Sequence, residues 1–361
     1  MDNNRQENTT TESRNRKAIC KLAIDSHARD FVVARQLEGM TPQPPQRFSA
    51  SKFVGWVKKL LEQGYEVISC YEAGPTGYWL HRELVSLGVT NYVVCPTRLD
   101  SRGKGVNTDK TDALELLVRL DRYVAGNPKA FSVVQVPSVG QERKRQLSRQ
   151  RQQLRDKRLS FAAQGRMLLL SQGYHQSNSW WKKKLWEQLQ VSLPEWLVER
   201  LAVWVRLIEA VNEETKVLEK AIQDQAPKSL PLGMGRLTHE IVDREVKDWK
   251  QFKNRRQIGS YSGLTGGVSN SGEQRADLSI TKAGNRRLSS CLVECAWRLL
   301  LKQPQYWLVK KWRTVLLNPK VHSRRRKQAI VAFARQLLVD IWKWKTGKTT
   351  PEQLGWAMIS F

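Results

Sequence analysis

The sequence has a shortage of acidic residues, few cysteines and no long hydrophobic run, and each shortage excludes a class of protein. Its 34 Asp and Glu residues face 61 Lys and Arg residues, which gives a formal net charge of +27 and an attraction for polyanions. No stretch approaches the roughly 20 apolar residues that span a bilayer, and residues 1–16 lack the apolar segment of a signal peptide. We therefore expect a cytoplasmic, nucleoid-associated protein that binds nucleic acid, with no membrane partner.

The five cysteines are dispersed and form no Cys-x-x-Cys motif, so the sequence predicts reduced, buried thiols. Cys291 and Cys295 lie one helical turn apart, but no histidine or second cysteine pair completes a tetrahedral metal site. Packing in the interior is the simpler explanation for both.

The first part of the chain alternates strand and helix patterns. Residues 1–16 are polar and without hydrophobic period, which predicts a disordered tail. Residues 17–136 predict an α/β domain. Strands are expected at “AICKLAID”, “DFVVARQLEG”, “YEVISCYE” and “TNYVVCP”, and helices at “ASKFVGWVKKLLEQ”, after Pro75 and at the end of the domain.

Strand patterns stop after Pro137, and the rest of the chain is expected to be all-α or mainly helical. Residues 137–226 predict a basic helical hairpin, in which a second long helix returns antiparallel after a Trp-rich stretch. The seven-residue spacing of its apolar residues is typical of a coiled-coil arm; they are Leu147, Leu154, Phe161 and Leu168. Residues 227–361 predict a helical domain with a Gly- and Ser-rich loop at 263–272 and a final basic helix, “SRRRKQAIVAFARQLLVDIWKWK”.

Four acidic residues occupy positions that a metal-dependent nuclease would use. Asp25 and Glu72 close two expected strands, and ligand sites of α/β sheets lie beyond the carboxyl ends of strands. Asp109 and Asp112 open an expected helix at i, i+3 spacing, which places both carboxylates on one face. Carboxylate oxygens are ligands for Mg²⁺, and two such ions about 4 Å apart stabilise the attacking and leaving oxygens of a phosphodiester displacement.

The same four residues also have a structural explanation. Asp25 would be a turn residue, Glu72 a surface acid, and Asp109 and Asp112 first-turn acids that favour the helix dipole. Spacing alone does not decide between the two explanations. The positive charge of the chain favours the metal site, because it would attract a nucleic-acid substrate.

A second candidate site lies in “GLTGGVSNSGEQRADLSITKAGNRRL”, which joins the Gly-rich loop to several cations. Backbone amides, as at Gly284, together with Lys282, Arg286 and Arg287 suit a phosphate group. Ser269, Ser271 and Ser279 are candidate nucleophiles if a metal or a base activates them. The alternative is that serines of such a loop are structural.

Seven segments occur in a specific order along the chain: “AIDSH”, “YEAGPTGY”, “NTDKTDA”, “RQRQQLRDKR”, “LPLGMGRLT”, “FKNRRQIGSYSGLTGGVSNSGEQ” and “ITKAGNRRL”. Together they resemble transposases of the insertion-sequence one-hundred-and-ten family. Members of that family are DEDD recombinases that combine a RuvC-like (RNase H-like) domain with a serine-bearing transposase domain and use a bridge RNA. The shared order is more specific than any single motif.

The resemblance implies a Mg²⁺ site in a RuvC-like domain at 17–136 and a serine nucleophile in a transposase domain at 227–361. The implied metal ligands are Asp25, Glu72, Asp109 and Asp112. The serine before glycine in “NSG” is Ser271, with Ser269 as the alternative. It would attack a DNA phosphate and form a covalent phosphoserine link that conserves the bond energy for rejoining. The chain departs from the family at Gly266, where proline is usual, and in its Trp-rich arm.

The basic segments fit the same family, because dense cations contact phosphates. The residues expected to contact nucleic acid are Arg143, Arg149, Arg151, Arg155, Lys282, Arg286, Arg324, Arg325 and Arg326. The resemblance implies that a noncoding bridge RNA selects donor and target DNA by base pairing, and a homo-oligomer, either a dimer or a tetramer, is expected. The arm tryptophans would pack the hairpin, stack on RNA or form a subunit interface.

Three functions remain open on the sequence. The first is an RNA-guided DNA transposase or recombinase that moves an insertion sequence. The second is a RuvC-like, Mg²⁺-dependent nuclease or Holliday junction resolvase, in which activated water replaces the serine. The third is a non-catalytic nucleic-acid-binding protein whose acidic residues only shape the fold.

Overall fold

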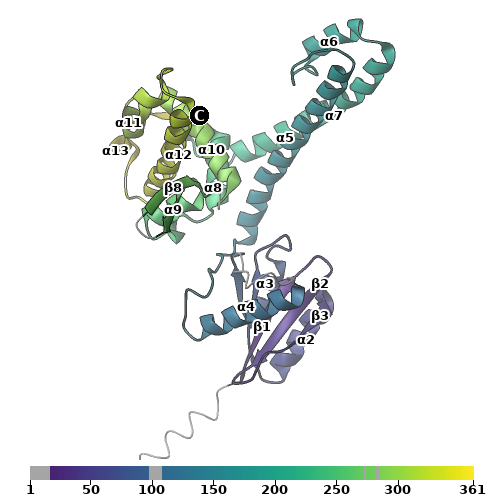
Figure 1. The fold of residues 1–361 in the computed structure, drawn as a ribbon, viewed down its shortest axis with the longest axis vertical. Helices are drawn as coiled ribbons and strands as arrows, with labels where there is room; N and C mark the ends of the chain where they lie inside the picture. The colour runs from purple at the N-terminus through teal and green to yellow at the C-terminus, as the bar shows by residue number, and fades with distance from the viewer. Residues whose placement is uncertain (1–16, 97–107, 272–273, 282–283) are drawn as a thin grey trace, which may run out of the picture. The chain divides into compact units, whose positions relative to one another are not determined.

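The structure of the chain is a computed structural model that divides into two compact units, one ending at Val136 and one from Pro137 to Phe361 (Figure 1). It describes residues 17–96, 108–271, 274–281 and 284–361, with only the backbone described at 268–271 and 274–278. The predicted tail at 1–16 and the predicted phosphate contact Lys282 lie outside the described residues.

The first unit is built on a mixed five-stranded sheet, which confirms the predicted α/β class. Its strands are β1 (Ile19–Ser26), β2 (Asp30–Leu37), β3 (Gln43–Ser49), β4 (Glu66–Glu72) and β5 (Thr90–Val94). They follow the order β3-β2-β1-β4-β5. Because β1, β4 and β5 are parallel, their carboxyl ends meet at one edge of the sheet.

The strand β3 is absent from the sequence prediction because its segment, “QPPQRFS”, carries two prolines. Proline has no backbone N–H to donate to a sheet, so it is confined largely to edge strands. The structure places β3 at the edge, antiparallel to β2.

Helices cover both faces of this sheet, as the apolar run of β1 requires. They are α2 (Ala50–Glu62), α3 (Trp79–Ser86) and α4 (Asp109–Val124). On one face, Leu22 of β1 shares a core with Phe53 of α2 and with α3. On the other face, Ala23 shares a core with Leu117 of α4. Since strand residues alternate between faces, Asp25 is in phase with Ala23 on the α4 side.

Helix α3 begins later than the sequence predicts, at Trp79 rather than at Pro75. Gly77 has φ +69°, in the left-handed region, which a right-handed helix cannot include. The Tyr71 hydroxyl donates a hydrogen bond to the Gly77 carbonyl over 3.0 Å and so holds this turn against β4.

The second unit begins with an antiparallel pair of long helices. The arm helices are α5 (Val139–Ser171), α6 (Lys183–Ser192) and α7 (Glu195–Gln223). Figure 1 shows α5 and α7 side by side. Near the base, Arg151 Nε donates to Glu219 Oε1 over 2.8 Å, and farther along α5 the ring centroids of Phe161 and Trp204 lie 5.5 Å apart. These pairs fix the antiparallel direction of the hairpin.

The contact between the two helices is not formed by the predicted heptad residues alone. The residues at seven-residue spacing, from Leu147 to Leu168, are half-buried. Smaller residues of α5, including Ser148, Ala162 and Gly165, are fully buried. Regular coiled-coil packing therefore stays a prediction.

Tryptophans close the tip of the arm. Trp180 is fully buried, and its indole Nε1 donates to the Ala162 carbonyl over 2.8 Å. The Trp186 ring packs edge-on against it, with 5.8 Å between ring centroids. These two side chains pack the hairpin, whereas Trp196 is 49% exposed.

Replacing Gly165 by alanine should destabilise the arm by about 1–3 kcal/mol, because the helix surface there has no space for a methyl group. A Cβ atom at Gly165 would lie 2.1 Å from Cζ2 of Trp180. Gly140→Ala in the same helix is the control, since a Cβ there meets only Ser138 Oγ, at 4.0 Å. Urea unfolding followed by tryptophan fluorescence measures both. Equal stability of the two variants would contradict the packing at the tip.

The rest of the second unit is mainly helical, as predicted. Its elements are β6 (Ser229–Pro231), α8 (Arg236–Val246), a 3-10 helix η2 (Trp249–Gln251), α9 (Arg255–Tyr261), β7 (Gly266–Ser271), β8 (Gln274–Ile280), α10 (Arg286–Lys302), α11 (Trp307–Leu316), α12 (Ser323–Lys345), α13 (Pro351–Leu354) and β9 (Met358–Ser360). The predicted final basic helix has the bounds of α12. Phe333 and Leu337 of α12 share the core with Leu292 of α10.

The Gly- and Ser-rich segment at 263–272 is not simply a loop, as the sequence predicts. Most of it forms β7, which pairs antiparallel with β8. Gly and Ser are poor strand formers by local preference, and the pairing partner that stabilises them is not visible in the segment itself.

All five cysteines are free thiols, and Cys20, Cys70 and Cys295 are buried. Burial raises the pKa of Cys291 to about 12 and that of Cys295 to about 11, so both thiols are protonated at neutral pH. This agrees with packing rather than metal binding. Cys95 is exposed, contrary to the prediction that the cysteines are buried.

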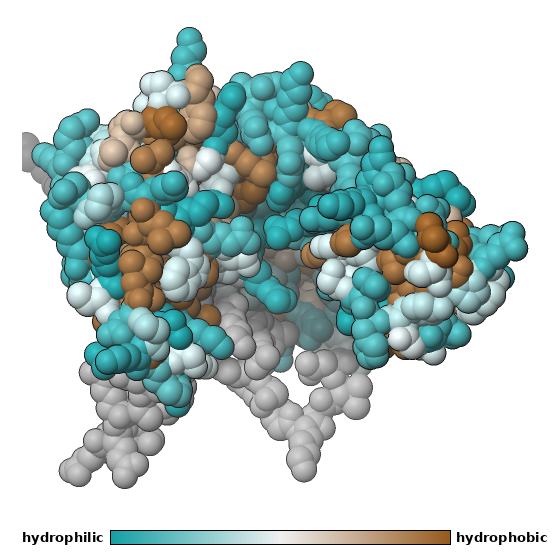
Figure 2. Space-filling model, turned by 90° about the horizontal axis from the view of Figure 1, so that it is seen from above, coloured by the Kyte–Doolittle hydropathy of each residue, from teal (hydrophilic) through white to brown (hydrophobic). Residues whose placement is uncertain are grey.

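The face of the molecule in Figure 2 is mainly hydrophilic, with separate hydrophobic patches. Exposed hydrophobic side chains include Val191, at 90% exposure, and Leu301, at 69%. Among the described residues, no helix combines the length and the apolar character needed to cross a membrane.

Candidate active site

The first unit brings together the four acidic residues predicted to bind metal. Glu72 is the last residue of β4, and Asp25 is the second-last residue of the neighbouring β1. The two strands are parallel, with Ile24 opposite Tyr71, so Asp25 and Glu72 follow a paired position at the same edge.

Helix α4 brings the other two acidic residues to this edge. Lys21 Nζ lies 2.5 Å from Asp121 Oδ1, which fixes the last turns of α4 beside the start of β1. The first turn of α4, with Asp109 and Asp112, therefore lies beside the end of β1. Thr108 caps the helix, since its side chain accepts a hydrogen bond from the Thr111 backbone N–H over 3.3 Å.

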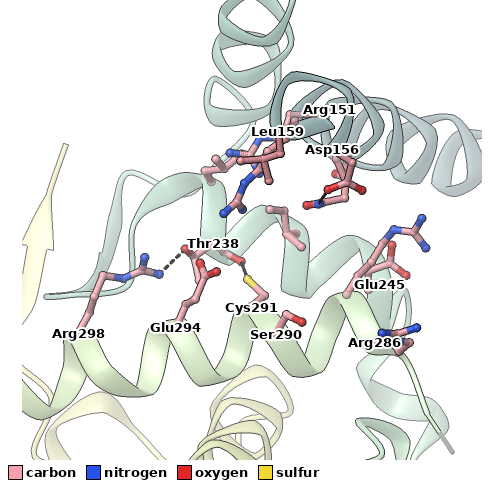
Figure 3. Close-up of a pocket in the computed structure, with 16 residues that line it drawn as sticks. Arg151, Asp156, Leu159, Thr238, Glu245, Arg286, Ser290, Cys291, Glu294 and Arg298 are labelled. Carbon is pink, nitrogen blue, oxygen red and sulfur yellow. Dashed lines mark hydrogen bonds between the residues drawn. The ribbon is translucent and has the colours of Figure 1, made fainter. Parts of the chain in front are cut away.

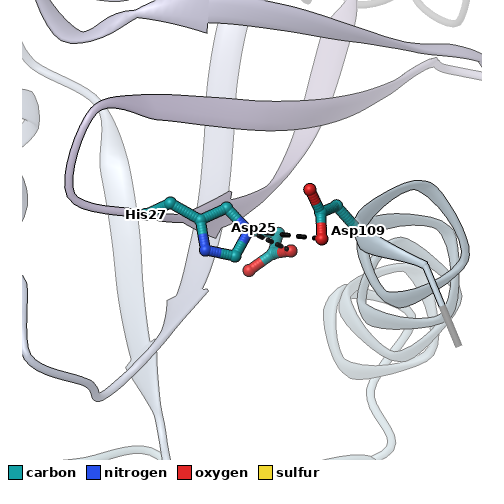
Figure 4. A group of neighbouring side chains, drawn as sticks. All are labelled: Asp25, His27 and Asp109. Atoms are coloured by element: carbon teal, nitrogen blue, oxygen red, sulfur yellow. Dashed lines mark hydrogen bonds and ion pairs between the residues drawn. The ribbon is translucent and has the colours of Figure 1, made fainter.

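A histidine lies inside the acidic cluster (Figure 4). His27 Nε2 is 3.0 Å from Asp25 Oδ2 and 3.6 Å from Asp109 Oδ1. One ligand atom from each of these three residues lies within 4.8 Å of the others, so they could share a metal ion. His27 is not among the residues predicted from the sequence. Its one local signal is its position two residues after Asp25 in “AIDSH”, because side chains at that spacing share one side of an extended chain.

Arg47 is a second residue of the site that was not predicted from the sequence. Its Nη2 lies 2.9 Å from Asp109 Oδ2 and its Nη1 lies 2.6 Å from Asp30 Oδ2. Arg47 belongs to β3, the strand that was not predicted from the sequence because it contains two prolines. No local signal identifies it, because its contact with Asp109 depends on the packing of α4.

Burial and the neighbouring acidic side chains raise the pKa values of two residues of the cluster, Asp25 and Glu72. Burial has the largest effect and raises the pKa of Asp25; His27 partly lowers it, and the charges of Asp109 and Asp112 raise it further. Burial also raises the pKa of Glu72, which Arg119 lowers in part and Asp25 and Asp112 raise. Both carboxyls keep a raised pKa although His27 and Arg119 lie nearby, and a bound divalent cation with a preference for carboxylate oxygen would stabilise their charged forms.

Replacing Asp112 by asparagine should stabilise the metal-free protein and remove its response to Mg²⁺. The change removes a charge that repels Asp25 and Glu72, so we expect the Tm without metal to rise by roughly 2–4 °C. Thermal unfolding with EDTA and with Mg²⁺ measures both effects. In the wild-type protein Mg²⁺ should raise the Tm.

The response to pH follows from the raised pKa values of the same cluster. The folded protein holds protons on Asp25 and Glu72 at a pH where the unfolded chain has lost them. The metal-free protein should therefore lose stability as the pH rises from the ordinary carboxyl pKa through the raised values. The stabilisation by Mg²⁺ should grow over the same range. A wild-type Tm that is insensitive to Mg²⁺ at neutral pH would contradict the metal site.

The predicted nucleophile lies in the second unit, at the end of β7. Ser271 pairs with Gln274 of β8, and Ser269 pairs with Ala276. Their side chains are not described, so the two serines remain alternatives. The third candidate, Ser279, is an exposed residue of β8.

The departure from the family pattern at Gly266 is at the start of the same hairpin. Gly266 is the first residue of β7 and pairs with Ile280.

The arginines predicted to contact nucleic acid have different surroundings. Arg149 and Arg151 form ion pairs with glutamates of the same unit. Arg155 and Arg286 line a pocket. The remaining predicted arginines in the described part are Arg143 on α5, which is exposed, and Arg324, Arg325 and Arg326 in the first turn of α12. Cations at a helix start oppose the helix dipole, so an anion bound there would be stabilising.

A family model described as “Transposase IS116/IS110/IS902 family” matches residues 228–310. The matched segment contains β7, β8 and α10, and with them the candidate serines.

Three curated proteins are similar over most of the chain. “Putative transposase y4rJ” of Sinorhizobium fredii is 30% identical over 307 residues, which cover 78% of this chain and 77% of that protein. “Transposase for insertion sequence element IS1111A” of Coxiella burnetii is 26% identical over 320 residues, 84% of each chain. “Transposase for insertion sequence element IS1533” of Leptospira borgpetersenii is 26% identical over 262 residues, 67% of this chain and 73% of that protein.

Proposed function

The chain belongs to the IS116/IS110/IS902 family of transposases, and we propose that it moves an insertion sequence by cutting and rejoining DNA with a Mg²⁺ site and a serine nucleophile. Two of the relatives are described as transposases for insertion sequence elements. For this chain, the same activity makes donor and target DNA its substrates.

The observation that carries the proposal is the convergence of four carboxylates at one sheet edge. Asp25, Glu72, Asp109 and Asp112 are the residues that would hold Mg²⁺, with His27 beside two of them. Bound there, the metal would neutralise charge on the phosphate and on the attacking and leaving oxygens. The site lies at the ends of parallel strands, which supports a RuvC-like fold for the first unit.

Ser271, with Ser269 as the alternative, would supply the covalent step. Its Oγ attacks a DNA phosphorus, so that an Oγ–P bond forms while one P–O bond of the strand breaks. The serine proton passes to a base, and the leaving oxygen takes up a proton. Because the phosphoester is retained, a hydroxyl of another strand can reverse the reaction and rejoin DNA without an external energy source.

A bridge RNA would select the two DNA sites, and a homo-oligomer would allow the acidic cluster of one subunit to act with the serine of another. The net charge of +27 supports the binding of two nucleic acids at once. If base pairing with RNA selects the DNA sequence, the protein itself needs only cations that contact phosphates and no side chains that read bases.

The second candidate function is a RuvC-like, Mg²⁺-dependent nuclease or junction resolvase that uses activated water. It is favoured by one observation: the acidic cluster is formed entirely by residues of the first unit. Such a site would need no serine from the second unit.

The experiment that tests the proposal places the gene and its flanking DNA on a plasmid and measures excision and insertion by sequencing. The purified protein is also analysed for bound RNA. We expect precise excision, insertion at defined sites and one defined noncoding RNA. DNA cleavage without rejoining would instead support the nuclease.

A further inference from the structure

A cavity of about 770 Å³ lies within the second unit, between α5 of the arm and helices α8 and α10 (Figure 3). Arg151 is on the α5 side of the cavity, and Arg286 and Arg298 are on the α10 side. A cavity of this size accommodates a short segment of a ligand rather than a single ion. Its walls come from the predicted arm and from the predicted transposase domain.

Buried polar contacts hold the two walls together. Arg244 of α8 is buried, and its Nη1 donates to the Lys144 carbonyl over 3.1 Å and to Ser148 Oγ over 3.3 Å, both on α5. Glu245 is 1% exposed and lies 3.2 Å from Arg149 Nη2 of α5. The position of α5 relative to α8 is therefore fixed by buried charge, where loss of a partner is costly.

Glu245 also connects α5 to α10. Asn285, the N-cap of α10, donates from Nδ2 to Glu245 Oε2 over 2.6 Å. Burial alone would raise the pKa of Glu245, but the hydrogen bonds from Arg149 and Asn285 lower it below the ordinary value, so this carboxylate stays charged. Both cationic walls are thus held by one buried carboxylate.

Some arginines around the cavity already bind a protein partner, and the others are available to a ligand. Arg151 pairs with Glu219, and Arg298 donates to the Thr238 hydroxyl over 2.6 Å. Within the described part of the chain, the side chains of Arg155, Arg286 and Arg287 form no hydrogen bond or ion pair. The lining carries five arginines and three acidic residues, and the three available guanidiniums come from two different helices.

We propose that this cavity binds the phosphate backbone of nucleic acid, with Arg155 of the arm and Arg286 and Arg287 of α10 as its ligands. Guanidinium groups present a planar set of donors that matches phosphate oxygens in paired hydrogen bonds. The site deepens the proposed function, on which it rests: the arm and the domain that carries the candidate serines together hold one strand segment. The sequence already predicts phosphate contacts for these three arginines, and the structure adds that they line one cavity.

The test removes the three available charges together. The variant Arg155→Gln, Arg286→Gln, Arg287→Gln is compared with the wild-type protein in binding to a DNA duplex and to an RNA hairpin of the same sequence over a range of salt concentrations. The slope of log affinity against log salt should decrease by about 0.9 for each lost contact to duplex DNA. A loss confined to one probe identifies whether DNA or RNA occupies the cavity.

Two controls separate the site from general charge and from misfolding. Arg200→Gln, Arg206→Gln, Arg313→Gln removes three exposed arginines that do not line the cavity, and its salt slope should change less. The variant Arg155→Lys, Arg286→Lys, Arg287→Lys keeps the charges and should retain the slope. An unchanged slope in the glutamine variant, or an equal change in the control, would overturn the proposal. If the wild-type protein binds nucleic acid through this cavity but exchanges no DNA, the proposed function would be contradicted and the binding site would stand.

Discussion

Replacement of Asp25 by asparagine should reduce DNA cleavage by about 10³-fold or more, corresponding to about 4 kcal/mol in the activation barrier. Asp25 is close to every other member of the cluster. It lies beside Glu72 at the sheet edge, and its Oδ2 is 3.0 Å from His27 Nε2. The charges of Asp109 and Asp112 raise its pKa. Asparagine keeps the shape of the side chain but loses the charge that would hold Mg²⁺. Cleavage of labelled DNA in single-turnover reactions measures the effect.

Glu115→Gln is the matched control for this variant. Glu115 is an exposed acidic residue on α4, the helix that carries Asp109 and Asp112. Its loss changes the net charge by the same amount and should leave cleavage within about twofold, as expected for a surface position. If Asp25→Asn cleaved DNA as fast as Glu115→Gln, the acidic cluster would have a structural role only.

Replacement of Ser271 by alanine should abolish the covalent protein–DNA adduct and reduce strand exchange by on the order of 10³-fold or more, because no other group takes over the bond to phosphorus. The substrate is a suicide DNA whose nicked product cannot be rejoined, so that the wild-type adduct accumulates. Denaturing gels measure it directly.

The matched controls are the other serines of the same hairpin. Ser279→Ala should retain the adduct. Loss of the adduct in Ser269→Ala, together with its persistence in Ser271→Ala, would move the nucleophile two residues along β7. Cleavage by the wild-type protein without any adduct would contradict the serine mechanism and support activated water.

The long helices could be predicted from sequence because their signals are local. The bounds of α12 agree with the basic segment, and Asp109 and Asp112 open α4 as their spacing indicates. Apolar period and capping residues lie within a few positions of the helix that they specify.

Two strands could not be predicted from the local sequence. The prolines of β3 and the glycines of β7 disfavour a strand locally, and each is stabilised by a neighbour in the sheet. Hydrogen bonding to a partner strand depends on residues elsewhere in the chain, so it cannot be predicted from the composition of the segment itself.

The candidate site shows the same division. Asp25, Glu72, Asp109 and Asp112 could be identified because strand ends and a helix start are visible in the sequence. The side chains around these four residues could not be identified from the sequence. The contact of Arg47 with Asp109, for example, requires both β3 and the packing of α4 against the sheet.

The sequence by itself determined the family, the positive charge and the positions of the four acidic residues, since these are carried by residue types and their order. Only the tertiary structure decided that His27 lies among the acidic residues, that Arg149 and Arg151 are engaged in ion pairs, and that Arg155 shares a cavity with α10. The physical reason is that a side chain's charge is fixed by its chemistry, whereas its partner is fixed by which distant segment packs against it.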